Sequence, residues 1–132
     1  MEDRFKYLGE NLLPRFWDKD NNEMIYPYFD RVNNWIRYEV IMVDKRYFYP
    51  LDWMLFGKNR FIEQKPTGLK DRNGKLIFEG DWIKGEKREG KVLFQKGGFY
   101  CYDELLIESL QEDSCEIIGN IYENPELLER II

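Results

Sequence analysis

The chain of 132 residues contains no histidine, the side chain that most often transfers protons near neutral pH and most often binds zinc. It has only two cysteines, Cys101 and Cys115, which are too few for a thiolate zinc site and are not spaced as a C-x-x-C redox pair. We therefore expect two free thiols in the core. The same absences predict no catalytic residue, no metal site and no cofactor.

Long apolar runs are missing as well. No stretch approaches the roughly 18 residues that a membrane helix needs, and residues 1–5 lack the charged-then-apolar order of a signal peptide. We therefore expect no membrane association and a cytoplasmic location. The net charge of -5 also disfavours nucleic acid, because affinity for phosphates comes largely from Lys and Arg.

Aromatic residues, in contrast, are abundant. They make up 17% of the chain, and large rings pack well on the half-buried surface of a sheet. With 43% hydrophobic residues, the chain is far from the composition of a disordered protein and fits a single domain. The composition therefore predicts one mainly β domain.

The first part of the domain, about residues 14–66, reads as a β-rich extension. A turn-forming cluster between two extended runs predicts a hairpin, and alternating apolar residues predict a longer strand further on. The extended segments of this part are Arg15–Trp17 and Glu23–Tyr28, which flank the turn, then Trp35–Val43 and Arg60–Gln64.

The second part, about residues 67–122, has short strands separated by glycine turns, which predicts a small SH3-like barrel. Asn73-Gly74 supplies the positive backbone angles of a tight hairpin turn. Further strands are expected at Asp81–Lys84, Lys91–Gln95, Phe99–Tyr102 and Cys115–Ile118, while Asp103–Leu110 fits either a helical turn or another strand.

A short helix is predicted to close the domain over residues 124–132. Asn124 is suited to cap its first turn, and Pro125 fits the first helical position. We expect Leu127, Leu128 and Ile131 to form one apolar stripe against the domain.

Three segments together resemble the YopX family of phage and prophage proteins over roughly residues 15–128. They are Trp17-Asp18-Lys19 with Glu23-Met24, the run from Thr67 to Lys75 with Phe78-Glu79-Gly80-Asp81, and the run from Glu116 to Leu128. The resemblance implies a small β-rich fold with an SH3-type barrel, encoded by a phage or prophage and acting inside a bacterial cell. It implies no catalytic residue. It leaves open whether Trp82, where a smaller aliphatic residue is common, lies in the core or on the surface.

Two groups of carboxylates resemble a metal site or a catalytic pair, but their sequence patterns support neither. Asp18-x-Asp20-x-Asn22 begins like a calcium loop, but Glu23 replaces the glycine and Phe29 replaces the glutamate that such a loop needs. Glu79 and Asp81 are close in sequence, yet we expect Asp81 to accept hydrogen bonds from backbone amides at the strand break.

Basic and aromatic residues between positions 84 and 102 form the candidate partner-binding surface, which consists of Lys84, Lys87, Arg88, Tyr100 and Tyr102. If Phe99 and Cys101 point into the barrel, Tyr100 and Tyr102 point out. Exposed tyrosines serve as anchors for protein partners and equally as simple cross-strand pairs, so both interpretations stay open.

The leading hypothesis is a non-catalytic module that binds an unknown protein of the phage or of its bacterial host. The first alternative is a nucleic-acid-associated accessory protein, since the same lysines with nearby rings suit single strands. A carboxylate-dependent hydrolase is the second alternative. Self-association stays open.

Overall fold

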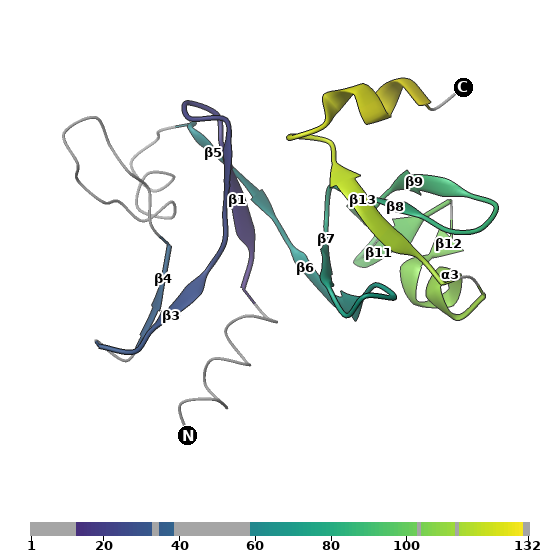
Figure 1. Ribbon diagram of the computed structural model, residues 1–132, viewed down its shortest axis with the longest axis horizontal. Coiled ribbons are helices and arrows are strands. Elements are labelled where there is room, and N and C mark those ends of the chain that lie inside the picture. Colours follow the sequence, from purple (N-terminus) through teal and green to yellow (C-terminus); the bar gives the residue numbers. More distant parts are fainter. Residues whose placement is uncertain (1–12, 33–34, 39–58, 103, 113, 131–132) are drawn as a thin grey trace. The chain divides into compact units, whose positions relative to one another are not determined.

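The computed structural model describes residues 13–32, 35–38, 59–102, 104–112 and 114–130, which form mainly β structure (Figure 1). The chain divides into two compact units, Met1–Gln64 and Lys65–Ile132. Each unit has its own cluster of buried apolar side chains. Within the described residues, no helix is both long and apolar enough to cross a membrane.

The first unit contains an antiparallel sheet of order β2-β1-β5. Its strands are β1 (Arg15–Asp18), β2 (Glu23–Ile25) and β5 (Phe61–Gln64). The predicted hairpin is confirmed, with Phe16 opposite Ile25. The carboxylate of Asp18 starts the turn by accepting the backbone amide of Asp20 at 3.0 Å, as expected of Asp in such a turn.

A second hairpin joins β3 (Tyr28–Asp30) to β4 (Trp35–Arg37). The strand predicted over 35–43 is thus observed at its start, and its remainder after Tyr38 lies outside the described residues.

The core of the first unit consists of Phe16, Ile25, Tyr38 and Phe61, with Leu13 packed against it. The rings of Phe16 and Tyr38 meet edge to face at 5.2 Å between centroids, a preferred aromatic geometry. The hydroxyl of Tyr38 donates to the carbonyl oxygen of Pro14 at 2.6 Å, which satisfies its polar end. Burial raises the pKa of this hydroxyl above its usual range.

The second unit begins with the hairpin of β6 (Pro66–Lys70) and β7 (Leu76–Phe78). This confirms the hairpin predicted from Asn73-Gly74, since Gly74 has a φ of 78°. The carboxylate of Asp71 accepts the backbone amides of Asn73 and Lys75, both at 2.9 Å, and that of Ile117 at 3.0 Å. One buried aspartate therefore fixes the turn and joins it to a distant strand.

A central sheet of order β13-β8-β9 and a neighbouring sheet of order β10-β11-β12 complete the strands of this unit. They are β8 (Asp81–Lys84), β9 (Glu89–Lys91), β10 (Leu93–Gln95), β11 (Gly98–Cys101), β12 (Glu104–Leu105) and β13 (Glu116–Asn120). Helix α3 (Leu106–Glu112) follows β12, so the segment for which helix and strand were both open contains one of each.

The two sheets are linked at Val92, between β9 and β10. Its amide donates to the carbonyl oxygen of Asp81 at 2.8 Å, and its carbonyl oxygen accepts the amide of Gly80 at 2.9 Å. Even so, the described strands remain in separate small sheets. The mainly β class is confirmed, whereas the SH3-like barrel is not, because these sheets do not close on one another.

The core of the second unit lies between these elements. It consists of Ile77, Ile83, Val92, Cys101, Leu106 and Cys115. Both cysteines are free and buried, as predicted.

The chain ends with a 3₁₀ helix, η1 (Pro125–Arg130), which follows β13 (Figure 1, yellow). The predicted closing helix is present, but two of its details are wrong. Leu127 is buried while Leu128 is 41% exposed, because the tighter winding of a 3₁₀ turn does not keep both on one face. The side chain of Asn124 accepts the amide of Asn120 at 3.3 Å, so it holds the preceding turn. Ile131 lies outside the described residues.

Trp82 is a core residue, only 1% exposed. It lies on β8 opposite Gly119 of β13. A Cβ at Gly119 would lie 2.5 Å from Oδ1 of Asn124 and 3.1 Å from Leu127. Glycine therefore lets η1 approach the outer face of the central sheet, where the Trp82 ring lies.

Candidate protein-interaction surface

The basic residues singled out in the sequence fall into two kinds. Lys84, at the end of β8, and Lys87, in the loop after it, are exposed. Arg88 is bound within the protein, because its Nη2 is 2.9 Å from Oε1 of Glu104. The same guanidinium lies 4.4 Å from the ring centroid of Tyr102, within the range of a cation–π contact. The lysines face solvent, while the arginine has internal partners.

Tyr102 does not point outward, which corrects the predicted alternation. It packs against the core of the second unit, and its hydroxyl lies 3.3 Å from the carbonyl oxygen of Arg88 and 3.8 Å from Sγ of Cys115. The physical reason is the backbone: Tyr102 has a φ of 57°, and this left-handed conformation ends the alternation of a strand. Burial raises the pKa of the Tyr102 hydroxyl well above its usual range.

Tyr100, in contrast, lies on the outer face of its sheet. It is directly opposite Leu93 of β10 on one side and Leu105 of β12 on the other, and opposed residues share a face. We call Leu93, Tyr100 and Leu105 the outer row. Both leucines are 38% exposed, and Tyr100 is half-buried. The outer row is thus an apolar stripe across three strands.

Gly98 supports this placement. A Cβ built on Gly98 would lie 3.5 Å from a methyl group of Leu105 and 3.6 Å from the ring of Tyr100. Both side chains therefore lean over the glycine. The absence of a side chain there gives the outer row a continuous surface.

The opposite face of this sheet points to the core. Phe99 packs against the core cluster, and Cys101, two residues on, belongs to it. Phe94 of β10 contacts Phe99 with ring centroids 5.0 Å apart and remains 39% exposed. The ammonium of Lys65 lies 5.4 Å from the Phe94 ring centroid. The alternation predicted for Phe99, Tyr100 and Cys101 is thus observed.

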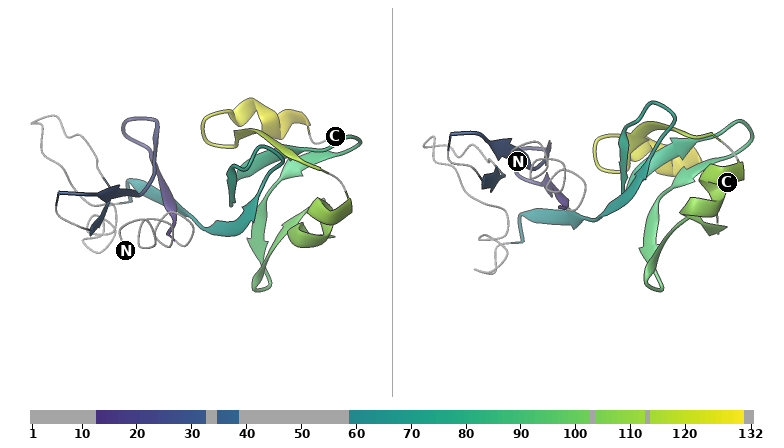
Figure 2. Two further views of the ribbon diagram at one scale, coloured as in Figure 1. Left: turned by 60° about the horizontal axis from the view of Figure 1, so that its bottom comes forward. Right: turned by 90° about the horizontal axis from the view of Figure 1, so that it is seen from below.

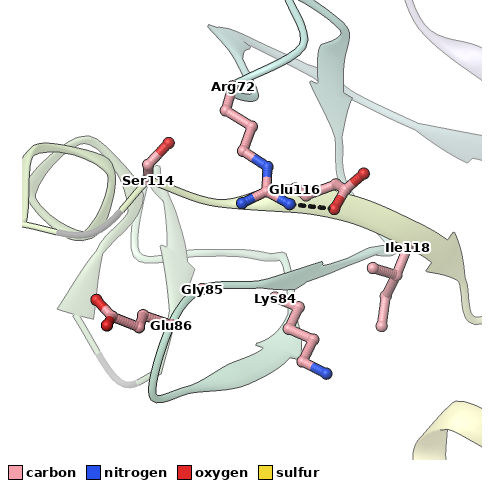
Figure 3. A pocket seen from close by; sticks show the side chains of 7 residues that line it. All are labelled: Arg72, Lys84, Gly85, Glu86, Ser114, Glu116 and Ile118. Carbon is pink, nitrogen blue, oxygen red and sulfur yellow. Dashed lines mark hydrogen bonds and ion pairs between the residues drawn. The ribbon is translucent and has the colours of Figure 1, made fainter.

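An open depression of about 630 Å³ lies elsewhere on the second unit (Figure 3). Its lining residues are Arg72, Lys84, Gly85, Glu86, Ser114, Glu116 and Ile118. Nη2 of Arg72 lies 2.5 Å from Oε2 of Glu116, so two of its charges neutralise each other. Lys84 sits in a cross-strand row between Glu89 and Glu116. With its charges balanced, the depression favours no ligand of either sign.

The carboxylates considered for catalysis or metal binding have structural partners. Asp18 is fully buried and bound by Arg60, with Nε–Oδ1 at 2.7 Å and Nη2–Oδ2 at 2.8 Å. Asp81 accepts the backbone amide of Phe78 at 2.8 Å, which confirms its predicted role at the strand break. Among the described residues, no three acidic or cysteine side chains are grouped as a metal site would require.

Sequence reasoning identified Tyr100 but missed Leu93 and Leu105 as its neighbours. Their alignment depends on the register of two strand pairs. In the structure Lys96 and Gly97 have φ values of 51° and 74°, which mark a two-residue type I′ hairpin turn and fix the register on both sides. The expected strands Lys91–Gln95 and Phe99–Tyr102 left Gly98 in the turn, whereas the structure places it in β11.

Comparison with known proteins supports the sequence resemblance. The family described as YopX protein matches residues 15–129. No curated protein matches. Among solved structures, the crystal structure of protein EF1440 from Enterococcus faecalis is similar, with a TM-score of 0.56 and 28% sequence identity, covering 89% of this chain and 99% of that chain. The match spans both units and all of the described strands, and the chain therefore belongs to the YopX family.

Proposed function

We propose that this YopX-family chain is a non-catalytic interaction module, encoded by a phage or prophage, that binds a protein in the bacterial cytoplasm. The partner belongs to the host cell or to the phage's own machinery. The observation that carries the proposal is the outer row, an apolar stripe of Leu93, Tyr100 and Leu105 on a solvent-facing side of a sheet.

The outer row has the composition of a docking surface. A tyrosine between two leucines offers apolar area with a polar tip, and such residues are enriched in the centres of interfaces. Lys84 and Lys87 are exposed on the same unit, and Lys84 lines the depression of Figure 3. Of the five residues predicted to bind a partner, Tyr100 and these two lysines remain accessible, whereas Tyr102 packs against the core and Arg88 is bound by Glu104 and Tyr102.

The chemistry of the described acidic groups favours binding over catalysis. Asp18, Asp71 and Asp81 are buried and hold backbone amides or Arg60. A hydrolase that works with paired carboxylates needs two such groups free in a cleft. These residues serve the fold, and the proposal assigns no reaction to them.

A pull-down from bacterial lysate tests the proposal. The bait is the full chain, with and without nuclease, next to a variant in which Tyr100→Ala and Leu105→Ser remove the outer row. The matched control is Leu128→Ser with Ile107→Ala, at residues that are 41% and 51% exposed on other elements. We expect a protein that is retained by the parent and by the control and is lost from the outer-row variant.

Two results would contradict the proposal. Retention of the same protein by the outer-row variant would show that this surface does not bind it. Loss of every captured protein on nuclease treatment would favour the nucleic-acid-associated alternative. The folded state of each variant is checked by circular dichroism, because Gly98 and its neighbours pack under the outer row.

A further inference from the structure

The strand β10 has one edge that no other described strand covers. It is the end member of its sheet, whose order is β10-β11-β12. On this side of β10, the backbone of Val92 is hydrogen-bonded to Gly80 and Asp81. Gly80 has a φ of 90°, and the chain turns away from β10 there. The covering by β8 therefore stops at Val92, and the hairpin of β10 and β11 continues as a two-stranded ribbon (Figure 2, green).

The hairpin geometry identifies which backbone groups face this edge. Gln95 and Gly98 flank the two-residue turn and are a hydrogen-bonded pair, as in a type I′ hairpin. Hydrogen-bonded and non-bonded pairs alternate along an antiparallel ladder. The pair Phe94–Phe99 is therefore non-bonded, and the N–H and C=O of Phe94 point to the uncovered edge. These groups are the hydrogen-bonding template for an added strand.

Lysines lie at this edge, and one carboxylate, that of Glu79, accepts the backbone amide of Lys65 at 3.2 Å. Lys91 precedes β10, Lys96 follows it, and the ammonium of Lys65 lies over the ring of Phe94 between them. Within the described residues, neither Lys91 nor Lys96 has a carboxylate within 4.0 Å, whereas Arg72, Arg88 and Arg130 each pair with a glutamate. The edge is thus a basic strip on an acidic protein of net charge -5.

We propose that the uncovered edge of β10 binds an extended segment of a partner protein that is rich in Asp and Glu and pairs with residues 93–95 as an added strand. This inference rests on the proposed function and names the chemistry of its partner. An added strand lies roughly 4.8 Å from β10, within reach of the lysine side chains. Its alternate residues extend the outer row, and acidic residues near its two ends lie within reach of Lys91 and Lys96.

Charge also disfavours the binding of a second copy of the chain at the β10 edge. Pairing β10 with β10 of another copy brings two sets of the same lysines together, and like charges across a strand pair are destabilising. An acidic segment removes that repulsion and gains attraction, which also directs the encounter at low salt.

The probe is a synthetic peptide of alternating Glu and Val, seven residues long, compared with a peptide of alternating Lys and Val. Each is titrated into the full ¹⁵N-labelled chain at low and moderate salt. We expect the Glu peptide alone to shift the amide signals of residues 93–96. The amide exchange of Phe94 should slow roughly tenfold when the peptide is at about ten times its dissociation constant.

Two variants test the charge and the edge separately. Lys91→Glu with Lys96→Asp should weaken binding of the Glu peptide by roughly threefold to tenfold, the effect of two exposed ion pairs. Asp tolerates the left-handed conformation of position 96. Lys19→Asp with Lys75→Glu changes the net charge equally at exposed turns elsewhere and should leave binding unchanged. Phe94→Pro removes the outward N–H without touching a bond to β11 and should abolish the shifts while the amide spectrum stays dispersed.

The outcomes separate the two proposals. Equal binding of both peptides, or signal shifts confined to other elements, overturns the edge proposal. If no peptide binds yet the lysate partner still depends on Tyr100 and Leu105, the edge proposal is wrong and the proposed function stands. If the Glu peptide binds at β10 but no protein depends on the outer row, the edge is confirmed and the proposed function is wrong.

Discussion

Arg60 and Asp18 form a buried ion pair in the first unit, with side chains 7% and 0% exposed. Two charge-assisted hydrogen bonds join them, and the hydrogen bond to Asp18 is the main cause that raises the pKa of Arg60. Removing one partner leaves an uncompensated buried charge. We expect Arg60→Ala to lower the free energy of unfolding by about 3–5 kcal/mol, measured by urea denaturation.

The control for this prediction is Arg72→Ala. Arg72 pairs with Glu116 on the surface, with side chains 51% and 39% exposed. An exposed pair contributes little, so this loss should stay below about 1 kcal/mol. Similar losses for the two variants would show that the Arg60 pair is not isolated from water as the structure indicates.

Cys101 makes the stability of the second unit dependent on pH. Burial raises the pKa of its thiol to about 12, whereas an unfolded cysteine titrates near 8.5. Above that value the unfolded chain loses the proton while the native chain keeps it, so stability is full below about pH 8.5 and falls as pH rises. Between about pH 7.5 and about pH 9.5, this group alone should remove about 1.4 kcal/mol.

The variant Cys101→Ala isolates this contribution. Urea denaturation at the two pH values should give a smaller decrease for the variant than for the parent, by about the stated amount. Tyr38 and Tyr102 also have raised pKa values, but unfolded tyrosines titrate only near 10. Equal decreases in both proteins would assign the pH dependence to other groups.

At this scale, the sequence predicted what depends on a residue's own neighbours. The role of Asp81 followed from the strand break next to it. The partner of Asp18 did not, because Arg60 is 42 positions away and reaches it only through the pairing of β1 with β5. Tyr102 was misplaced because a single left-handed residue reverses a side chain, and no glycine or asparagine marked the position.

At the scale of elements, η1 contributes through one leucine. Leu127 is 6% exposed and lies above Gly119, whereas Leu128 next to it is 41% exposed. Truncating a buried leucine typically destabilises a protein by about 2–5 kcal/mol. We expect Leu127→Ala to lower the free energy of unfolding by about 2–4 kcal/mol and Leu128→Ala by less than about 0.5 kcal/mol.

Thermal melts of these two variants test the packing of η1 directly. The pair is matched in chemistry and differs in burial, so equal shifts in Tm would contradict the observed placement. Binding of the lysate partner should survive in Leu128→Ala. Loss of that partner without a change in Tm would make η1 a binding element and not a structural one.

Most elements were predictable because turn residues mark their ends. Asn73-Gly74 and Gly80 mark the turns, so the strands between them could be predicted. The arrangement of strands into sheets was less accessible, since β8 pairs with β13, more than thirty positions away. The expected barrel is not confirmed at this level, because short strands of even spacing suit a closed barrel and separate small sheets equally well.

At the scale of the molecule, burial and ion pairing determine which charged side chains are accessible to a partner. Their position in the sequence matters less. In the part of the chain that the structure describes, Arg60, Arg72, Arg88 and Arg130 each pair with a carboxylate. Among the described lysines, Lys91 and Lys96 flank β10, whereas Lys19, Lys75, Lys84 and Lys87 are exposed elsewhere. The candidate surface was thus partly visible in the sequence as a basic, aromatic segment, but pairing decided which of its members are accessible.

This distribution predicts weak binding to nucleic acid. The net charge of -5 repels phosphates over the whole surface, and Arg88 is held by Glu104 and Tyr102, which leaves few cations to displace counterions. Labelled single- and double-stranded oligonucleotides of random sequence should bind with dissociation constants above roughly 10 µM at physiological salt. Glu86→Lys with Glu104→Gln, which adds a cation and frees Arg88, should strengthen binding and steepen its salt dependence, as a positive control. Micromolar or tighter binding by the parent that persists in moderate salt, and drops when Lys87→Ala and Arg88→Ala are combined, would replace protein binding by nucleic-acid association as the function of this surface.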